Sequence, residues 1–122
     1  MKKLFAALFV AAAMTFGAFA QDTLPSGTWV DKNYNAEWVI GVDGSITIRD
    51  ASSGEVYKKF SPLTQNFKFS TSLDGLTLTF RCNETSRTYK ITKGISASAD
   101  LTLAIERDWT DEPYEVTIKF KN

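Results

Sequence analysis

The 122-residue sequence contains no histidine and only one cysteine. The absence of histidine excludes the Ser-His-Asp and Cys-His systems of nucleophilic catalysis, and it also excludes the imidazole sites that hold most transition metals. Hydrolysis by carboxylates alone would need two acids that face one interior, and the residues whose spacing points them toward a core include no acid. We therefore expect that the protein is not an enzyme and that it uses neither a metal nor another cofactor.

Long apolar runs are missing except at the N-terminus. Lys2 and Lys3 precede an apolar run from Leu4 to Phe16, and Ala18-Phe19-Ala20 has the small-x-small pattern that signal peptidase cleaves. The run is too short to span a membrane comfortably, and no second run follows. Because this leader begins with lysines and is rich in alanine, we expect a bacterial signal peptide over residues 1–20. The mature protein would then be periplasmic or secreted, with no membrane span after cleavage.

An excess of positive charge is also missing. The chain has 14 basic and 14 acidic residues, so without Lys2 and Lys3 the mature part has 12 basic residues and a net charge of −2. Binding to a phosphate backbone needs a clustered positive field. No glycine-rich phosphate loop is present either. We therefore expect no nucleic acid among the partners.

The mature chain lacks helical periodicity. Apolar side chains at a period of 3.6 residues do not persist over three turns anywhere, whereas alternation with a period of two recurs throughout. Turn-forming residues separate nine alternating runs, at 28–31, 36–42, 45–50, 55–60, 66–72, 76–83, 87–93, 100–109 and a last run from Tyr114. The run 76–83 is the most regular, and it predicts that Cys82 is a small buried side chain and not a reactive thiol.

Short links between many short strands predict hairpins. We expect a short lead over residues 21–26 and one domain over 27–122. This domain would be all-β, an antiparallel up-and-down meander β-barrel of eight or nine short strands. A β-sandwich is the alternative, although it would need a long crossing between sheets. Asp43-Gly44 predicts a two-residue hairpin, and the alternation before it places Trp38 and Val42 on the inner face.

The opening Gly27-Thr28-Trp29, followed by the meander and the Asp43-Gly44 hairpin, resembles the calycin superfamily of lipocalins, fatty-acid-binding proteins and avidins, and avidins in particular. The resemblance implies a barrel in which Gly27 and Trp29 help to close one end and a basic side chain from a late strand lies across the tryptophan. If every link is a hairpin, Arg107 lies at the same end with inward parity, and it can stack on Trp29 as a cation–π pair. The alternative is that Arg107 extends to solvent from the strand end.

A barrel of this size has an interior that is either filled by side chains or holds one small ligand. The inward positions are bulky, which favours filling, but the sequence leaves both interiors open. The loop Asn33-Tyr34-Asn35 carries an amphipathic aromatic side chain between two amides, which suits recognition. We expect it at the end opposite Trp29, near Leu73 and Ile95. The candidate ligand-binding residues are Asn33, Tyr34, Asn35, Trp38, Phe69 and Tyr89.

These observations predict a secreted or periplasmic lipocalin-like binding protein that holds a small apolar ligand in the barrel or at its open end. The alternative is a proteinaceous inhibitor or interaction protein that acts on a hydrolase or other envelope partner. Small exported bacterial barrels that resemble lipocalins include protease inhibitors. In that case the lead from Gln21 to Ser26 and the Tyr34 loop would contact the partner.

Overall fold

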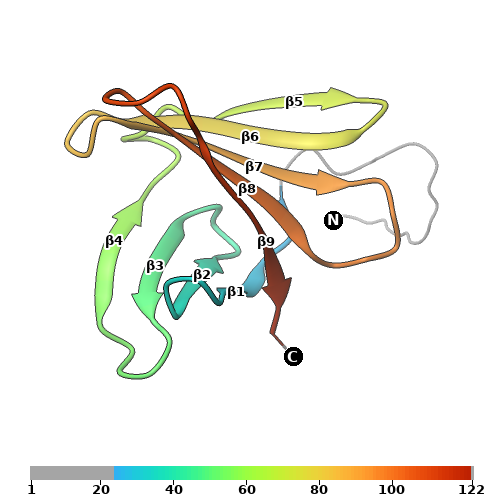
Figure 1. Cartoon of the computed structure of the whole chain (residues 1–122). Coiled ribbons are helices and arrows are strands. Elements are labelled where there is room, and N and C mark those ends of the chain that lie inside the picture. Colours follow the sequence, from blue (N-terminus) through green and yellow to red (C-terminus); the bar gives the residue numbers. More distant parts are fainter. Residues whose placement is uncertain (1–23, 122) are drawn as a thin grey trace.

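The computed structural model describes residues 24–121, which form nine antiparallel strands and no helix (Figure 1). The all-β meander is confirmed. The predicted signal peptide, residues 1–20, and the first part of the lead lie outside the described residues. Within 24–121, no helix is long and apolar enough to cross a membrane.

The strands follow the predicted runs in number and order. They are β1 (Gly27–Asp31), β2 (Ala36–Ile40), β3 (Ile46–Asp50), β4 (Val56–Phe60), β5 (Lys68–Ser72), β6 (Gly75–Cys82), β7 (Arg87–Gly94), β8 (Leu101–Arg107) and β9 (Tyr114–Phe120).

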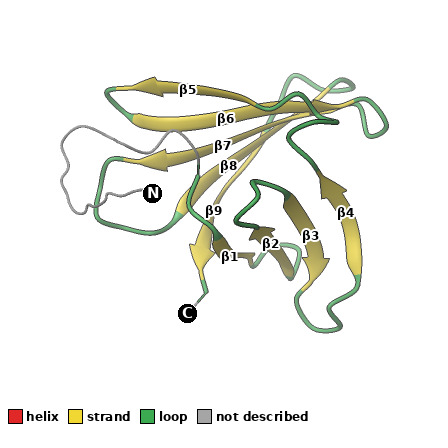
Figure 2. Cartoon of the chain, turned by 180° about the vertical axis from the view of Figure 1, so that it is seen from behind, coloured by secondary structure: helices red, strands yellow, loops and turns green. Residues whose placement is uncertain are grey.

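The strands form one sheet that curls into a half-barrel (Figure 2). Their order across the sheet is β4-β3-β2-β1-β9-β8-β7-β6-β5, so the first and last strands of the chain are neighbours at its centre. β1 and β9 pair antiparallel through Trp29 with Phe120 and Val30 with Lys119. The edges of the sheet are β4 and β5, which are consecutive in the chain but share no ladder.

The link between β4 and β5 is not a hairpin. It runs over residues 61–67 and is held by local hydrogen bonds, from Gln65 N to Ser61 O at 2.9 Å and from Phe67 N to Pro62 O at 3.4 Å. Pro62 has no N–H and cannot continue a strand ladder. Because all neighbours in the sheet are antiparallel, β4 and β5 have the same sense, and the link carries the chain from one edge to the other.

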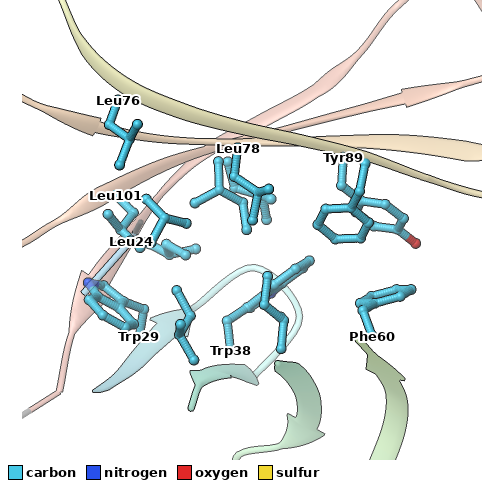
Figure 3. Packing of buried hydrophobic residues seen from close by; sticks show 14 of the residues in the cluster. Leu24, Trp29, Trp38, Phe60, Leu76, Leu78, Tyr89 and Leu101 are labelled. Carbon is cyan, nitrogen blue, oxygen red and sulfur yellow. The ribbon is translucent and has the colours of Figure 1, made fainter. Parts of the chain in front are cut away.

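The core lies inside the curl, between β1–β4 and β5–β9 (Figure 3). Aromatic rings join the two halves across the open seam. The ring of Phe60 on β4 lies 4.9 Å from that of Phe80 on β6 and 5.1 Å from that of Tyr89 on β7, and Phe60 is fully buried. An ion pair between Lys58 and Glu84 bridges the same seam at the surface. Side chains therefore join β4 to the other half where backbone pairing is absent.

Gly27 and Trp29 close one end of the core together with Phe120. The rings of Trp29 and Phe120 meet edge to face at 5.4 Å, and the indole N–H of Trp29 donates to the carbonyl of Ala99 at 2.7 Å. A Cβ at Gly27 would lie 2.9 Å from the Phe120 ring, and its φ of 151° also favours glycine.

The prediction that Arg107 stacks on Trp29 is wrong. Trp29 contacts Ala99, just before β8, whereas Arg107 ends β8 and lies about 26 Å further along at ~3.3 Å per residue. The prediction assumed that every link reverses the chain. Because the link 61–67 does not, β1 and β8 have the same sense and Arg107 lies at the other end. Leu73 and Ile95 are displaced for the same reason, toward the Trp29 end.

The link between β2 and β3 is longer than the predicted two-residue hairpin at Asp43-Gly44. β2 ends at Ile40, and residues 41–45 form the link, with a hydrogen bond of 2.9 Å from Gly41 N to Ser45 O. Gly44 has a φ of 87°, which supplies the turn. Val42 therefore lies in the loop and is 97% exposed instead of facing the core.

Cys82 is buried at the end of β6, 2% exposed, as the alternation predicted.

On the outer face, Glu37 of β2 is buried beneath two cations. Its carboxylate accepts from Arg49 Nε at 2.8 Å and from Lys121 Nζ at 2.5 Å. The hydrogen bond from Lys121, and then that from Arg49, hold the pKa of Glu37 below its ordinary value of 4.5. This pair of contacts ties the end of the described chain to β2 across β1.

We expect Phe60→Ala to lower the free energy of unfolding by about 3 to 4 kcal/mol, because it leaves a cavity in the core. Within residues 24–121, the Phe60 ring makes the only aromatic contacts that join β4 to β6 and β7. Urea denaturation followed by tryptophan fluorescence measures the loss. Phe69→Ala is the matched control, since Phe69 lies on the edge strand β5 and is 39% exposed. An equal loss in both variants would contradict this role of Phe60.

Glu37→Gln should lower the free energy of unfolding by about 1 to 2 kcal/mol at pH 7, because two charge-assisted hydrogen bonds are lost. The native carboxylate has a lowered pKa, so its stabilisation is present above pH 4.5 and declines as the pH falls below that value. The two proteins should therefore converge in stability on acidification. A difference that stays constant from pH 7 to pH 3 would rule out the ionised pair as its cause.

Candidate functional site

The half-barrel contains a cavity of about 370 Å³ at the end away from Trp29. This volume is within the range of small-molecule sites, about 300 to 1,000 Å³. Strands and loops from both halves of the sheet contribute to its wall. The lining residues are Asp31, Tyr34, Ala36, Trp38, Ile48, Tyr57, Arg87, Tyr89, Ile105, Arg107 and Tyr114.

The inner wall of the cavity is apolar. Trp38 and Tyr89 are almost fully buried, and their rings lie 6.1 Å apart and tilted. Ala36 precedes Trp38 on the inner face of β2 and is 5% exposed. Its methyl group fills little of the space between the strands, and so the curl stays open here while large side chains fill it at the Trp29 end.

One side of the cavity is fixed by a polar network around Asp31. This carboxylate is 2% exposed and accepts from the backbone N–H of Asn33 at 2.9 Å and from the hydroxyl of Tyr114 at 2.9 Å. The Asn33 side chain donates to the Tyr114 hydroxyl at 3.0 Å. Burial, supported by the hydrogen bond to Asp31, raises the pKa of Tyr114 to about 12. Tyr114 is therefore a neutral donor at physiological pH.

Tyr34 forms the rim next to this network. It is 65% exposed, and its ring meets that of Tyr114 edge to face at 5.3 Å. Tyr57 of the edge strand β4 lies on the wall, and its hydroxyl donates to Asp50 at 2.9 Å.

Two arginines complete the mouth. Arg87 and Arg107 are opposite each other in the β7–β8 register, and both line the cavity. Their guanidinium carbons lie 5.1 Å and 6.0 Å from the centre of the Trp109 ring. Arg107 also donates from Nη2 to the carbonyl of Glu112 at 2.8 Å. With Asp31 as the one acid of the lining, the two guanidiniums give this wall a formal charge of +1.

The structure brings together some of the predicted ligand-binding residues and separates others. Tyr34, Trp38 and Tyr89 all line the cavity, and Asn33 supports it through Tyr114. Asn35 turns away, with a φ of 50° and its amide donating to Ser52. Phe69 lies outside the cavity on β5.

Sequence reasoning missed Asp31, Arg87 and Tyr114 as members of one site. The inward set does contain an acid, contrary to our expectation, because Asp31 has the same parity as Trp29 on β1. That parity was a signal in the sequence. Arg87 likewise shares the parity of Tyr89, but nothing local shows that it is opposite Arg107.

Comparison with protein-family models, curated proteins and solved structures finds no match for this chain. The resemblance to calycins therefore stays a prediction, and the function has to be argued from the cavity itself.

We expect Tyr114→Phe to lower the free energy of unfolding by about 1 to 2 kcal/mol at pH 7, because the buried carboxylate of Asp31 loses a donor. Thermal or urea unfolding measures this loss. Tyr34→Phe is the control at the exposed neighbouring ring and should change stability little.

The same tyrosine predicts alkaline behaviour. Tyr114 in the folded protein holds its proton to about pH 12, while an ordinary tyrosine releases it at 10.0. The contribution of this group to stability is thus complete below pH 10 and is lost as the pH rises toward 12. Stability should fall less steeply over this interval in Tyr114→Phe than in the native protein. Equal slopes would contradict the assignment.

Proposed function

We propose that this protein is a small-molecule-binding module, without catalytic activity, that holds a mainly apolar ligand in the cavity lined by Trp38 and Tyr89. The observation that carries the proposal is the cavity of about 370 Å³, which has an apolar inner wall.

The shape of the site supports this proposal physically. Its inner wall consists of side chains that are already buried and packed, so binding needs little ordering of the protein. Burial of apolar ligand surface against Trp38 and Tyr89 contributes about 25 cal/mol per Å². The hydrogen-bonded pair of Asp31 and Tyr114 fixes the side of the wall. Concave sites with apolar walls and a few fixed polar groups are typical of ligand binding.

We favour this function over that of an inhibitor acting through its lead. Leu24, in the lead, is 7% exposed and belongs to the core, where it packs near Trp29 and Leu101 (Figure 3). A segment anchored in this way is less available to enter an enzyme's active site.

The proposal includes export to the periplasm or beyond, which rests on the leader pattern of residues 1–20. It also includes membership of the calycin superfamily, which rests on the resemblance carried by Gly27-Thr28-Trp29.

The neutral fluorescent probe phenylnaphthylamine tests the proposal, since its emission rises in an apolar site. We expect saturable binding to the native protein. Ala36→Leu should weaken probe binding by about tenfold, because the added side-chain atoms occupy part of the cavity and exclude the probe from that space. Val39→Leu is the matched control on the outer face of the same strand, and it should stay within about twofold.

Absence of saturable binding to the folded native protein would reject the small-ligand function. So would equal affinities of Ala36→Leu and the native protein, because the probe would then bind elsewhere. Native mass spectrometry of protein purified from its own host adds an independent readout. A retained small molecule supports the proposal, and a co-purifying hydrolase would favour the inhibitor alternative.

A further inference from the structure

We propose that Arg87 and Arg107 form an anion-binding subsite at the mouth of the cavity, and that the ligand is an aromatic anion. Such a ligand has a flat aromatic body and one carboxylate, sulfonate or phosphate group. This inference rests on the proposed binding function and specifies the chemical class of the ligand.

The two arginines converge on one place because of the β7–β8 register. Arg87 and Arg107 are directly paired, and each shares the inward parity of a cavity residue two positions away, Tyr89 on β7 and Ile105 on β8. Side chains opposite each other on one face of an antiparallel pair have Cβ atoms about 5 Å apart. Both guanidinium carbons lie within 6.0 Å of the centre of the Trp109 ring, so two like charges share this region, and an anion bound to both would offset their repulsion.

Neither charge is neutralised by the protein. The chain has four arginines, of which Arg49 and Arg81 pair with Glu37 and Asp108. Within residues 24–121, no carboxylate oxygen lies within 4.0 Å of a guanidinium nitrogen of the other two. These two are also the arginines that line the cavity. Both arginines without an ion-pair partner among the described residues thus line the site.

The Arg107 side chain is held in place, and most of its N–H donors have no acceptor among the described residues. Its Nη2 is engaged by the carbonyl of Glu112, and its guanidinium lies by the ring of Trp109. Its Nε is buried and has no hydrogen-bond partner among the described residues. Buried donors are nearly always satisfied, and a guanidinium is suited to a planar oxyanion. Water does not reach this atom, so a ligand oxyanion would supply the missing acceptor after a small shift of the Arg107 side chain.

Asp31 does not oppose this assignment. Both of its oxygens already accept a hydrogen bond, from the Asn33 backbone and the Tyr114 hydroxyl. With two arginines and one aspartate, the lining still has a formal charge of +1. The carboxylate lies on the β1 side of the cavity, and the arginines lie on β7 and β8, which lets an anionic group approach the arginine side.

The walls favour an aromatic body over a flexible chain. Five of the lining residues are aromatic, and they come from both halves of the sheet: Tyr34, Trp38, Tyr57, Tyr89 and Tyr114. Aromatic groups prefer offset-stacked and edge-to-face contacts with such rings. The cavity volume of about 370 Å³, which is partly open to solvent, is suited to a compact molecule of two or three rings.

Two probes that differ by one acidic group test the subsite. Anilinonaphthalene sulfonate has the same ring system as phenylnaphthylamine and adds a sulfonate. We expect the native protein to bind the sulfonate at least about tenfold more tightly, as a charge-assisted hydrogen bond predicts. Its affinity should also fall as salt is added, whereas that of the neutral probe should not.

Variants then locate the charge. Arg87→Gln and Arg107→Gln should each weaken sulfonate binding by about tenfold and leave the neutral probe within about twofold. Lys90→Gln is the matched control, because it removes one positive charge from the outer face of β7, where Lys90 pairs with Glu106. It should leave the affinities of both probes unchanged. Near-ultraviolet circular dichroism checks that each variant is folded.

The outcomes separate the two proposals. If the neutral probe binds but the native protein does not prefer the sulfonate, this inference is overturned and the proposed function stands. The same holds if either arginine variant weakens both probes equally. If neither probe binds the folded native protein, both proposals fail. The comparison of the two probes on native protein decides the matter even if a variant does not fold.

Discussion

The contact of Phe60 with Phe80 and Tyr89 is the interaction on which the rest of the structure depends. β4 and β5 are the edges of a single curled sheet, and no backbone hydrogen bonds join them along the seam. The sheet could therefore open if only its ladders held it. Burial of three aromatic rings, two from β6 and β7 and one from β4, keeps the two halves facing each other. The edges themselves carry lysines, Lys58 and Lys59 on β4 and Lys68 on β5, which discourage pairing with other chains.

The cavity is a consequence of the same curl. Tyr89 belongs both to the aromatic contact and to the wall of the cavity, so the closure of the seam also positions one side of the site. Large side chains fill the curl around Trp29, but at the opposite end the inner position of β2 is Ala36. The small side chain of Ala36 leaves space in the wall of the hollow that a larger residue would occupy. The proposed ligand site and the stabilising aromatic contact share Tyr89, so changes to this residue would affect both.

The polar groups of the site depend on strand pairing more than on local sequence. Asp31 and Tyr114 are 83 positions apart and meet because β1 and β9 are neighbours in the sheet. Arg87 and Arg107 meet because β7 and β8 are paired in one particular register. An unpaired guanidinium at each of two adjacent positions would be unfavourable in a purely structural wall. Their convergence on an aromatic hollow is what distinguishes this end of the half-barrel from the closed end at Trp29.

The number of strands, their order along the chain and most of the inward residues, including Trp38, Tyr89 and Cys82, could be predicted from the sequence. These follow from a side-chain period of two, which is a local property that a short window of residues reveals. The tertiary structure alone decided that β4 and β5 do not pair, that Arg107 lies with Tyr34 and not with Trp29, and that Val42 is solvent-exposed. The first two depend on the direction that the chain takes after Pro62 and on which distant strands then become neighbours. No alternation within a strand encodes that choice, because both directions place the same side chains on the inner face.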